Sequence, residues 1–384
     1  MRSVKRLTAA FSAAMLVICL LFALSGTALA AAAPSADPTA SGEASAEFDS
    51  ILDTDDMFTD RDLRQTADLD DAVSYAVKDG EDIRIDTEGV YVLRGSASDV
   101  TVYVEAGKED KVQLVLDGVS ITNGGFPCIY VKSADKVFVT TSVDSALTVT
   151  GKFAPDGDVN ADGVIFSRAD LVLNGTAGLT ISSADNGVVC KDDLKITGGS
   201  YEIAADSRCL DANDSIRIAD GVLTLTAGSD ALRAENDDDD ALGFVYIQAG
   251  ELTVTAVEDA IQAHSVVQID GGTINLTAAE GLEGTYVQVN GGTVEIAARD
   301  DGINGAAMSD AYRPTVEING GALTIVMASG DTDGIDCNGD IVVNGGTVDV
   351  TGGSTFDYDG EGLLNGGTVI VNGVQVTELP DPAA

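Results

Sequence analysis

One short pattern recurs from about residue 185 to residue 372, and this repeat constrains the fold more than any other feature of the chain. Each unit has a polar or acidic residue, then Gly or Ala, then an aliphatic residue, then alternating strands separated by Gly-Gly or a similar turn. The aliphatic residue recurs at Val188, Leu210, Leu232, Ile261, Leu282, Ile303 and Ile335. Its spacing is 21 or 22 residues, apart from two longer gaps that contain polar insertions near 237–240 and 306–313. A fixed period in this range is typical of a solenoid whose repeats stack.

The composition of each unit indicates strands and no helices. Val, Ile, Leu and Thr alternate at period two and are interrupted by Gly, Asn and Asp. Three short strands with tight turns account for about 21 residues. The chain has 43 Gly and no Trp, which favours an aliphatic core with corners made of glycine. The sequence therefore predicts an all-β fold, a right-handed single-stranded parallel β-helix with coils about 4.8 Å apart.

The chain before the repeats predicts an exported protein. Residues 1–30 carry three basic residues, an apolar run and the ending Ala28-Leu29-Ala30, which is the pattern of a secretory signal peptide. We expect the mature protein to be secreted and free of the membrane. The predicted parts are a signal peptide (1–30), a flexible linker (31–47), a β-helix domain (48–373) that begins with an acidic N-terminal cap over the first coil (48–80), and a C-terminal tail (374–384).

The net charge narrows the possible binding partners, and the cysteines indicate the state of the thiols. The chain has 63 acidic residues against 21 Lys and Arg, a formal net charge of −42. Nucleic acid is therefore excluded as an expected partner, because phosphate binding needs positive charge. The four cysteines after the predicted signal peptide are expected to be buried free thiols. We expect a monomer.

The acidic residues are spaced in register with the repeat. The residue before the Gly or Ala is, coil by coil, Asn186, Arg208, Asp230, Asp259, Glu280, Asp301, Asp333 and Asp359. Stacked coils would place the last six in a ladder of carboxylates. Two charges 4.8 Å apart repel by about 3.5 kcal/mol at an effective dielectric constant of 20. We therefore expect raised pKa values or bound divalent cations, and oxygen ligands outside the cell favour Ca²⁺.

A second polar line runs beside this ladder. Its members are Asp211, Arg233, Gln262, Glu283, Asn304 and Asp336. The combined prediction for metal ligands is Asp230, Asp259, Glu280, Glu283, Asp301, Asp333, Asp336 and Asp359. The alternative is that these acids only solvate a corner and cap turn amides. At a different corner, Asn290, Asn319, Asn344 and Asn365 precede Gly-Gly and are predicted to form an amide ladder.

Several segments, taken in their order along the chain, resemble one protein family. They are Phe58-Thr59-Asp60-Arg61-Asp62-Leu63, the segments 88–95, 112–121 and 191–199, and the coils Asp301-Gly302-Ile303-Asn304 and Asp333-Gly334-Ile335-Asp336. The family is the secreted, calcium-containing parallel β-helix carbohydrate-binding domains related to polygalacturonate-binding proteins, which are similar in fold to pectate lyases. The resemblance covers residues 48–373 and implies Ca²⁺ and binding of a plant cell-wall polysaccharide. Ser207-Arg208-Cys209-Leu210 departs from the acidic-Gly-Ile motif, so only coils from Asp230 onward carry sites over.

Three functions remain open from the sequence. The first is a non-catalytic protein that binds an acidic, polygalacturonate-like polysaccharide, or cellulose, with Ca²⁺ on the acidic ladder. The second is a calcium-dependent polysaccharide lyase, whose candidate base is Arg233 because it lies in the second polar line between Asp211 and Gln262. Charge compensation of the ladder is the alternative role of Arg233. The third is an extracellular adhesin or structural rod.

Overall fold

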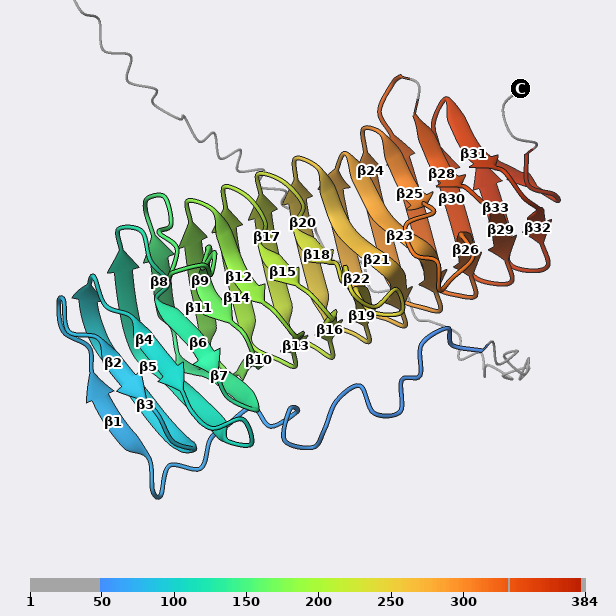
Figure 1. The fold of residues 1–384 in the computed structure, drawn as a ribbon. Coiled ribbons are helices and arrows are strands. Elements are labelled where there is room, and N and C mark those ends of the chain that lie inside the picture. The colour runs from blue at the N-terminus through green and yellow to red at the C-terminus, as the bar shows by residue number, and fades with distance from the viewer. Residues whose placement is uncertain (1–48, 331, 381–384) are drawn as a thin grey trace, which may run out of the picture. The chain divides into compact units, whose positions relative to one another are not determined.

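The computed structural model describes residues 49–330 and 332–380, and all regular structure in them is β-strand. Each strand except the last pairs in parallel with its equivalent in a neighbouring coil, so the strands form three stacks (Figure 1). This confirms the predicted all-β arrangement of stacked parallel strands. The predicted signal peptide and linker lie outside the described residues. No helix in residues 49–330 and 332–380 is long and apolar enough to cross a membrane.

The three stacks run through all the described coils. The first stack contains β1 (Val73–Ala76), β3 (Gly89–Ser98), β5 (Lys111–Asn123), β7 (Lys136–Val143), β10 (Asp170–Gly175), β13 (Asp193–Ile196), β16 (Ser215–Ile218), β19 (Phe244–Ile247), β21 (Asp259–Ile269), β23 (Glu280–Val289), β26 (Thr315–Ile318), β29 (Asp340–Val343) and β32 (Gly362–Leu364). The second contains β2 (Ile83–Ile85), β4 (Val102–Glu105), β6 (Ile129–Ser133), β9 (Gly163–Ser167), β12 (Asn186–Cys190), β15 (Leu210–Ala212), β18 (Leu232–Ala234), the first halves of β21 and β23, β25 (Asp301–Gly305), β28 (Asp333–Cys337) and β31 (Ser354–Tyr358).

The third stack begins with the second halves of β3 and β5. It continues through β8 (Ser145–Val149), β11 (Gly178–Ser183), β14 (Ser200–Ala205), β17 (Val222–Ala227), β20 (Glu251–Ala256), β22 (Thr273–Ala278), β24 (Thr293–Ala298), β27 (Ala322–Met327), β30 (Thr347–Thr351) and β33 (Thr368–Val371). The last strand, β34 (Val374–Val376), pairs antiparallel with β33 and ends the stack.

The hydrophobic core lies inside the three stacks. Alternate residues of the third-stack strands are buried and exposed, as the period-two pattern predicts. The aliphatic residues of the repeat meet in register on the second stack, where Ile261, Leu282 and Ile303 are fully buried. The four cysteines of the described residues are buried and free, as predicted: Cys128, Cys190, Cys209 and Cys337.

The corner that follows the first stack is held by the predicted asparagine ladder. Asn319 donates to Asn290, Asn344 to Asn319 and Asn365 to Asn344, each at 2.8 Å. The Gly-Gly after each Asn lets adjacent coils approach closely. At Gly321, where φ is +79°, a Cβ atom would lie 2.6 Å from the carbonyl oxygen of Gly292.

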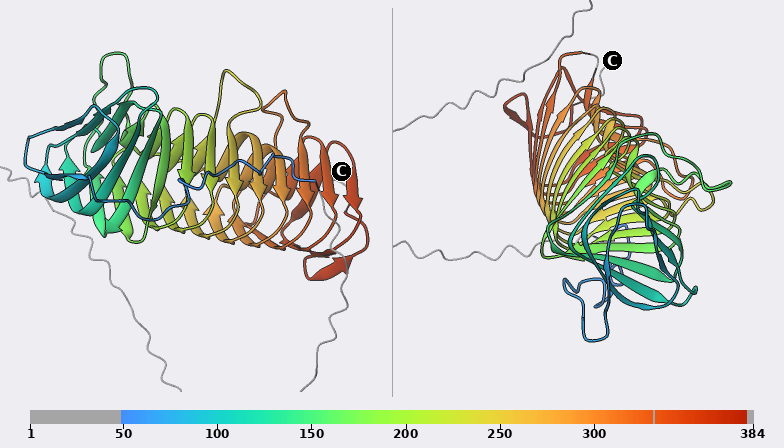
Figure 2. Two further views of the ribbon diagram at one scale, coloured as in Figure 1. Left: turned by 90° about the horizontal axis from the view of Figure 1, so that it is seen from below. Right: turned by 90° about the vertical axis from the view of Figure 1, so that its left-hand side faces the viewer.

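The N-terminal segment lies where the sequence did not predict it. Residues 48–80 were expected to cap the first coil, but residues 49–65 run along the outer face of the first stack (Figure 2). We call this segment the strap. Its backbone N–H at Ile51 donates to Gln288 Oε1 at 3.0 Å, many coils away from the first strand. Outward-facing polar side chains of the first stack satisfy the backbone of the strap, which makes the long flank a better site for it than the end of the solenoid.

A buried ionic group fastens the strap at its other end. Asp62 is fully buried, and its carboxylate lies 3.3 Å from Lys136 Nζ and 3.5 Å from Lys195 Nζ. Burial by itself raises the pKa of Asp62, but the Thr59 N–H and the two ammonium groups bring this pKa below its ordinary value. The strap therefore joins several coils through a carboxylate that is fully compensated by the chain.

Candidate cation site

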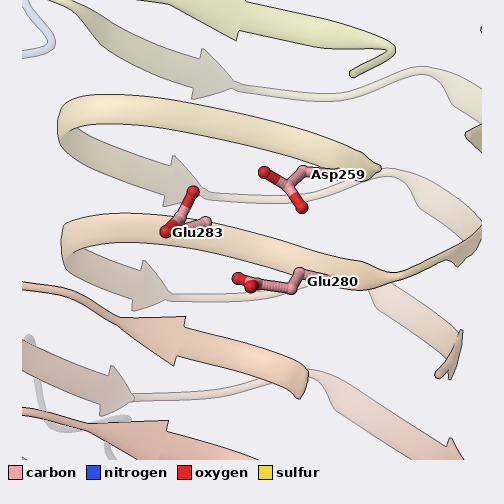
Figure 3. Close-up of side chains that lie close together, drawn as sticks. All are labelled: Asp259, Glu280 and Glu283. Atoms are coloured by element: carbon pink, nitrogen blue, oxygen red, sulfur yellow. The ribbon is translucent and has the colours of Figure 1, made fainter. Parts of the chain in front are cut away.

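Three carboxylates from two adjacent coils converge on the outer surface of the second stack (Figure 3). Asp259 begins β21, while Glu280 and Glu283 lie on β23. The register pairs Asp259 with Glu280 and Gln262 with Glu283. One oxygen from each of the three carboxylates lies within 4.8 Å of the other two. The prediction that stacked coils bring acidic residues together is correct here.

The local sequence explains this convergence. Ile261 and Leu282 point into the core, and Gln262 and Glu283, which follow them, face outward and are only partly buried. The small residues Ala260 and Gly281 lie between the acid and the aliphatic residue, and both are buried. A Cβ atom at Gly281 would lie 2.4 Å from the carbonyl oxygen of Gly302, so the backbones of adjacent coils are in close contact at this corner. Side chains that leave these backbones are therefore held near one another.

Electrostatic repulsion in the cluster is not relieved by the chain. Burial, followed by the charges of Glu280 and Glu283, raises the pKa of Asp259 to about 8. Burial and the charge of Glu283 raise the pKa of Glu280 to about 7. Among the described residues, no Lys or Arg forms a salt bridge with any of the three. The cluster is therefore a site where a cation would be strongly stabilised.

Two amide side chains supply the partial positive charge that is present. Gln262 donates from Nε2 to Asp259 Oδ2 at 3.1 Å and to Glu283 Oε2 at 2.5 Å. Its own Oε1 accepts a hydrogen bond from Arg233 Nε at 2.9 Å. Asn304 donates to Glu280 Oε2 at 3.0 Å. Both amides belong to the second polar line of the sequence, but sequence reasoning did not identify them as part of the site.

The donor set fits a hard divalent cation. Ca²⁺ takes about six to eight oxygen ligands, and three carboxylates offer up to about six. The cluster contains no thiol or imidazole, which would favour a softer metal. Asp259, Glu280 and Glu283 are thus the residues that would hold such an ion.

The other predicted ligands are arranged differently. Asp230 is buried, and its carboxylate accepts hydrogen bonds from Arg208 Nε at 3.2 Å and from the Asp259 backbone N–H at 3.3 Å. Asp301 pairs in register with Asp333 and accepts a hydrogen bond from the Asp333 backbone N–H at 3.2 Å. Burial and the charge of Asp336 raise the pKa of Asp301 to about 6. These side chains continue the ladder but do not join the three-carboxylate cluster.

The last member of the predicted ladder is wrong. The residue in register with Asp333 is Ser354, and the residue in register with Asp336 is Asp357. Asp359 lies beyond the end of β31 and is exposed. The sequence assignment followed the Asp-Gly pair, whereas the buried aromatic ring of Phe356 sets the register of this coil. Asp357 is the acidic residue that sequence reasoning missed.

Arg233 lies in the second polar line as predicted, in register between Asp211 and Gln262. Besides its bond to Gln262, it forms an ion pair with Glu235. Burial, followed by the nearby charge of Arg208, lowers the pKa of Arg233 from its usual value. These contacts fit the role of charge compensation at the border of the acidic coils.

Comparisons with known proteins place this chain in a family. A model of a family described as "carbohydrate-binding domain-containing protein" matches residues 79–285 and 279–378, which is more than half of the chain. The chain belongs to this family. Asp259, Glu280 and Glu283 lie within the matched residues.

Two individual proteins are similar to this family member. A carbohydrate-binding domain-containing protein of Acetivibrio thermocellus is 36% identical over 129 residues, which are 32% of this chain and 45% of the relative. The match thus spans less than half the length of that relative. A solved structure, "Structure of the polysaccharide lyase-like protein from C. thermocellum, Gadolinium derivative", matches with a TM-score of 0.50 and 28% identity. That match covers 65% of this chain and 99% of the solved chain.

Proposed function

We propose that this protein is a secreted, non-catalytic carbohydrate-binding protein, built as a right-handed parallel β-helix that binds an acidic polysaccharide through Ca²⁺. The observation that carries the proposal is the convergence of Asp259, Glu280 and Glu283 within 4.8 Å without a basic partner in the described residues. Membership of a carbohydrate-binding family supports a glycan as the partner. The predicted signal peptide supports secretion.

In this proposal, calcium overcomes the repulsion between the acidic protein and an acidic polysaccharide. A chain with a formal net charge of −42 repels a polyuronate. A divalent cation held by the cluster offers coordination positions to a sugar carboxylate, because Ca²⁺ accepts more oxygen ligands than the cluster supplies. Protein and polysaccharide are then joined through the ion rather than through a direct ion pair.

The solved relative is described as a gadolinium derivative. Lanthanide ions, like Ca²⁺, are hard cations that prefer oxygen ligands. We extend this preference to the acidic cluster of the present chain as part of the proposal.

A polysaccharide lyase is the second candidate, because the solved relative is described as a polysaccharide lyase-like protein. In this version Arg233 would take the proton next to the uronate carboxylate. Its hydrogen bond to Gln262 and its ion pair with Glu235 favour the structural role instead.

Affinity chromatography on immobilised polygalacturonate, with Ca²⁺ or with EDTA, tests the proposal. We expect retention in Ca²⁺, release by EDTA and no ultraviolet absorbance from unsaturated sugar products. Accumulation of such products would establish the lyase. Absence of retention in Ca²⁺ would refute acidic-glycan binding and leave a structural role.

A further inference from the structure

The second stack also carries outward-facing aromatic rings. They lie in the early coils, in the line of positions where the later coils have polar and acidic residues. Tyr103, Tyr130 and Phe166 occupy successive coils of the second stack in register. The ring centroids lie 5.9 Å apart between Tyr103 and Tyr130, and 5.5 Å apart between Tyr130 and Phe166. Phe126 packs on both tyrosines, with centroids at 6.2 Å from Tyr103 and 5.8 Å from Tyr130. These rings form a cluster outside the main core.

Comparison with another outer cluster shows that this one is incomplete. Phe244 and Tyr246 also lie outside the main core, but Leu52 and Met57 of the strap cover them. In the aromatic cluster of the early coils, Tyr130 and Phe166 are 1% exposed. Tyr103 and Phe126 remain partly exposed at its open end. No strap residue belongs to this cluster among the described residues, so the strap does not cover its open end.

The open end is a pocket of about 280 Å³. Its lining residues are Asp82, Asp99, Thr101, Tyr103, Asn123, Gly124, Gly125 and Phe126. The volume lies near the lower end of the range for ligand pockets, which suits a single small ring. The pocket thus combines two aromatic side chains with two carboxylates.

The polar groups of this pocket divide into structural and available ones. Asn123 is used by the fold, since it bonds to the backbone N–H and the carbonyl oxygen of Val100 at 2.9 and 2.8 Å. Asp82 accepts a hydrogen bond from the Thr101 N–H at 3.0 Å through one oxygen. Asp99 is exposed beside the rings and has a left-handed backbone, with φ of 55°. One oxygen of Asp82 and the carboxylate of Asp99 are directed to the pocket as acceptors.

The basic groups near Tyr103 are already neutralised. Arg84 lies over its ring at 4.4 Å and forms an ion pair with Glu105 at 3.3 Å. Lys132 forms an ion pair with Asp156 at 2.8 Å. The pocket therefore offers two free acceptor groups and no unpaired cation, which disfavours a uronate carboxylate.

We propose that this pocket is a calcium-independent subsite for one uncharged sugar ring. The apolar C–H groups of the sugar pack against Phe126 and the part of Tyr103 that Arg84 leaves uncovered, and its hydroxyl groups donate to Asp82 and Asp99. The buried rings of Tyr130 and Phe166 hold the two contact rings in place. The subsite rests on the proposed glycan-binding function and extends it to neutral sugars, at a place separate from the acidic cluster.

Binding of neutral oligosaccharides in EDTA tests the subsite. Cellohexaose, xylohexaose, mannohexaose and galactohexaose are titrated calorimetrically into the full chain and into Phe126→Ala and Asp99→Asn variants. Asn tolerates the left-handed backbone of position 99, so the second variant retains the fold. We expect the wild type to bind at least one of the four, and each variant to bind it at least about tenfold more weakly.

Two controls separate this subsite from the cation site. Tyr75→Ala removes another partly buried surface tyrosine, which stacks on Tyr91 at 6.3 Å, and is expected to leave the affinity unchanged. Glu283→Gln is expected to abolish calcium binding but leave neutral-sugar binding intact. If the wild type binds none of the four sugars, or the two pocket variants bind as it does, the subsite is refuted. If the subsite is refuted but the protein is still retained on polygalacturonate in Ca²⁺, the proposed function stands. If that retention is also absent, the subsite and the proposed function are both refuted.

Discussion

The coils before and after Arg233 differ in how their partly buried carboxylates are compensated. In the earlier coils, several half-buried or buried carboxylates have basic partners supplied by the chain, although burial and the charge of Asp170 raise the pKa of Asp192 to about 6. Asp193 binds Arg217 through two hydrogen bonds of 2.8 and 2.9 Å, and Asp230 binds Arg208. After Arg233 the sequence has 26 acidic residues and only two basic ones, Arg299 and Arg313. Neither of these forms an ion pair with the acidic cluster.

The contrast shows that stacking alone does not make a cation site. Both regions place polar residues in register at the same corner, and both bury them partly. The pKa of Asp62, in the strap on the first stack, is lowered by the Thr59 N–H and by its two lysine partners, whereas the pKa of Asp259 is raised to about 8. The three-carboxylate cluster of the later coils has no basic partner among the described residues, and in the proposed function an ion from solution supplies the counter-charge.

The largest effect is expected where the chain supplies the counter-charge. Asp62→Asn leaves Lys195 buried without an anion and Lys136 with Asp170 as its remaining partner, which should destabilise the protein by about 3–5 kcal/mol. Denaturant unfolding measures the change, and Asp60→Asn, an exposed acid of the strap, is the matched control. Equal stability of the two variants would contradict the assigned role of Asp62.

The next effect concerns stabilisation by calcium. At a Ca²⁺ concentration about 100 times the dissociation constant, binding stabilises the wild type by about 2.7 kcal/mol. Glu283→Gln should lose nearly all of this gain because one carboxylate of the cluster is removed. Asp238→Asn makes the same change of charge in an exposed loop and should keep the gain. Thermal unfolding with and without Ca²⁺ distinguishes the outcomes.

A third effect is the pH dependence of stability in EDTA. The pKa values of Asp259 and Glu280 are raised to about 8 and about 7, so the folded state holds more protons than the unfolded state from about pH 4 upward. Stability should therefore fall as pH rises from about 4 to about 8, by at most about 1.4 kcal/mol per pH unit for each extra proton. Solvent exposure of Glu280 reduces the amount. Saturating Ca²⁺ should flatten the profile, and a profile in EDTA that is already flat would contradict the repulsive cluster.

The smallest effect comes from giving a later coil the arginine of an earlier one. Gln262→Arg continues the line from Arg233 and places a guanidinium beside Asp259 and Glu283. We expect weaker calcium binding and a stability gain of about 1 kcal/mol at pH 8 in EDTA. Thr253→Arg, on the exposed face of β20, adds the same charge elsewhere and should change neither quantity. Unchanged calcium affinity in Gln262→Arg would show that the ion lies elsewhere.

The sequence predicted those features that depend on the repeat itself. The positions of Ile261 and Leu282, the Asn ladder and the vertical pairing of Asp259 with Glu280 all follow from a spacing of 21 or 22 residues. Asp359 was assigned wrongly because a local Asp-Gly pair resembles the motif, while the core position of Phe356 decides the register.

Features that depend on contacts across many coils were not predictable. The strap joins Ile51 to Gln288, 237 residues apart, and the repeat period does not indicate which segment lies on that outer face. Likewise, six stacked acids were expected, but the structure concentrates three carboxylates in one cluster. Arg208 neutralises Asp230, and a backbone amide binds Asp301, and neither contact is visible in the spacing.

Anomalous diffraction from crystals soaked in a terbium salt tests the central claim most directly. Tb³⁺ is a hard, oxygen-preferring substitute for Ca²⁺ and gives a strong signal at its position. We predict a peak between the carboxylates of Asp259, Glu280 and Glu283 that disappears in Glu283→Gln. Terbium found only at other positions, with these three carboxylates free of metal, would contradict the account.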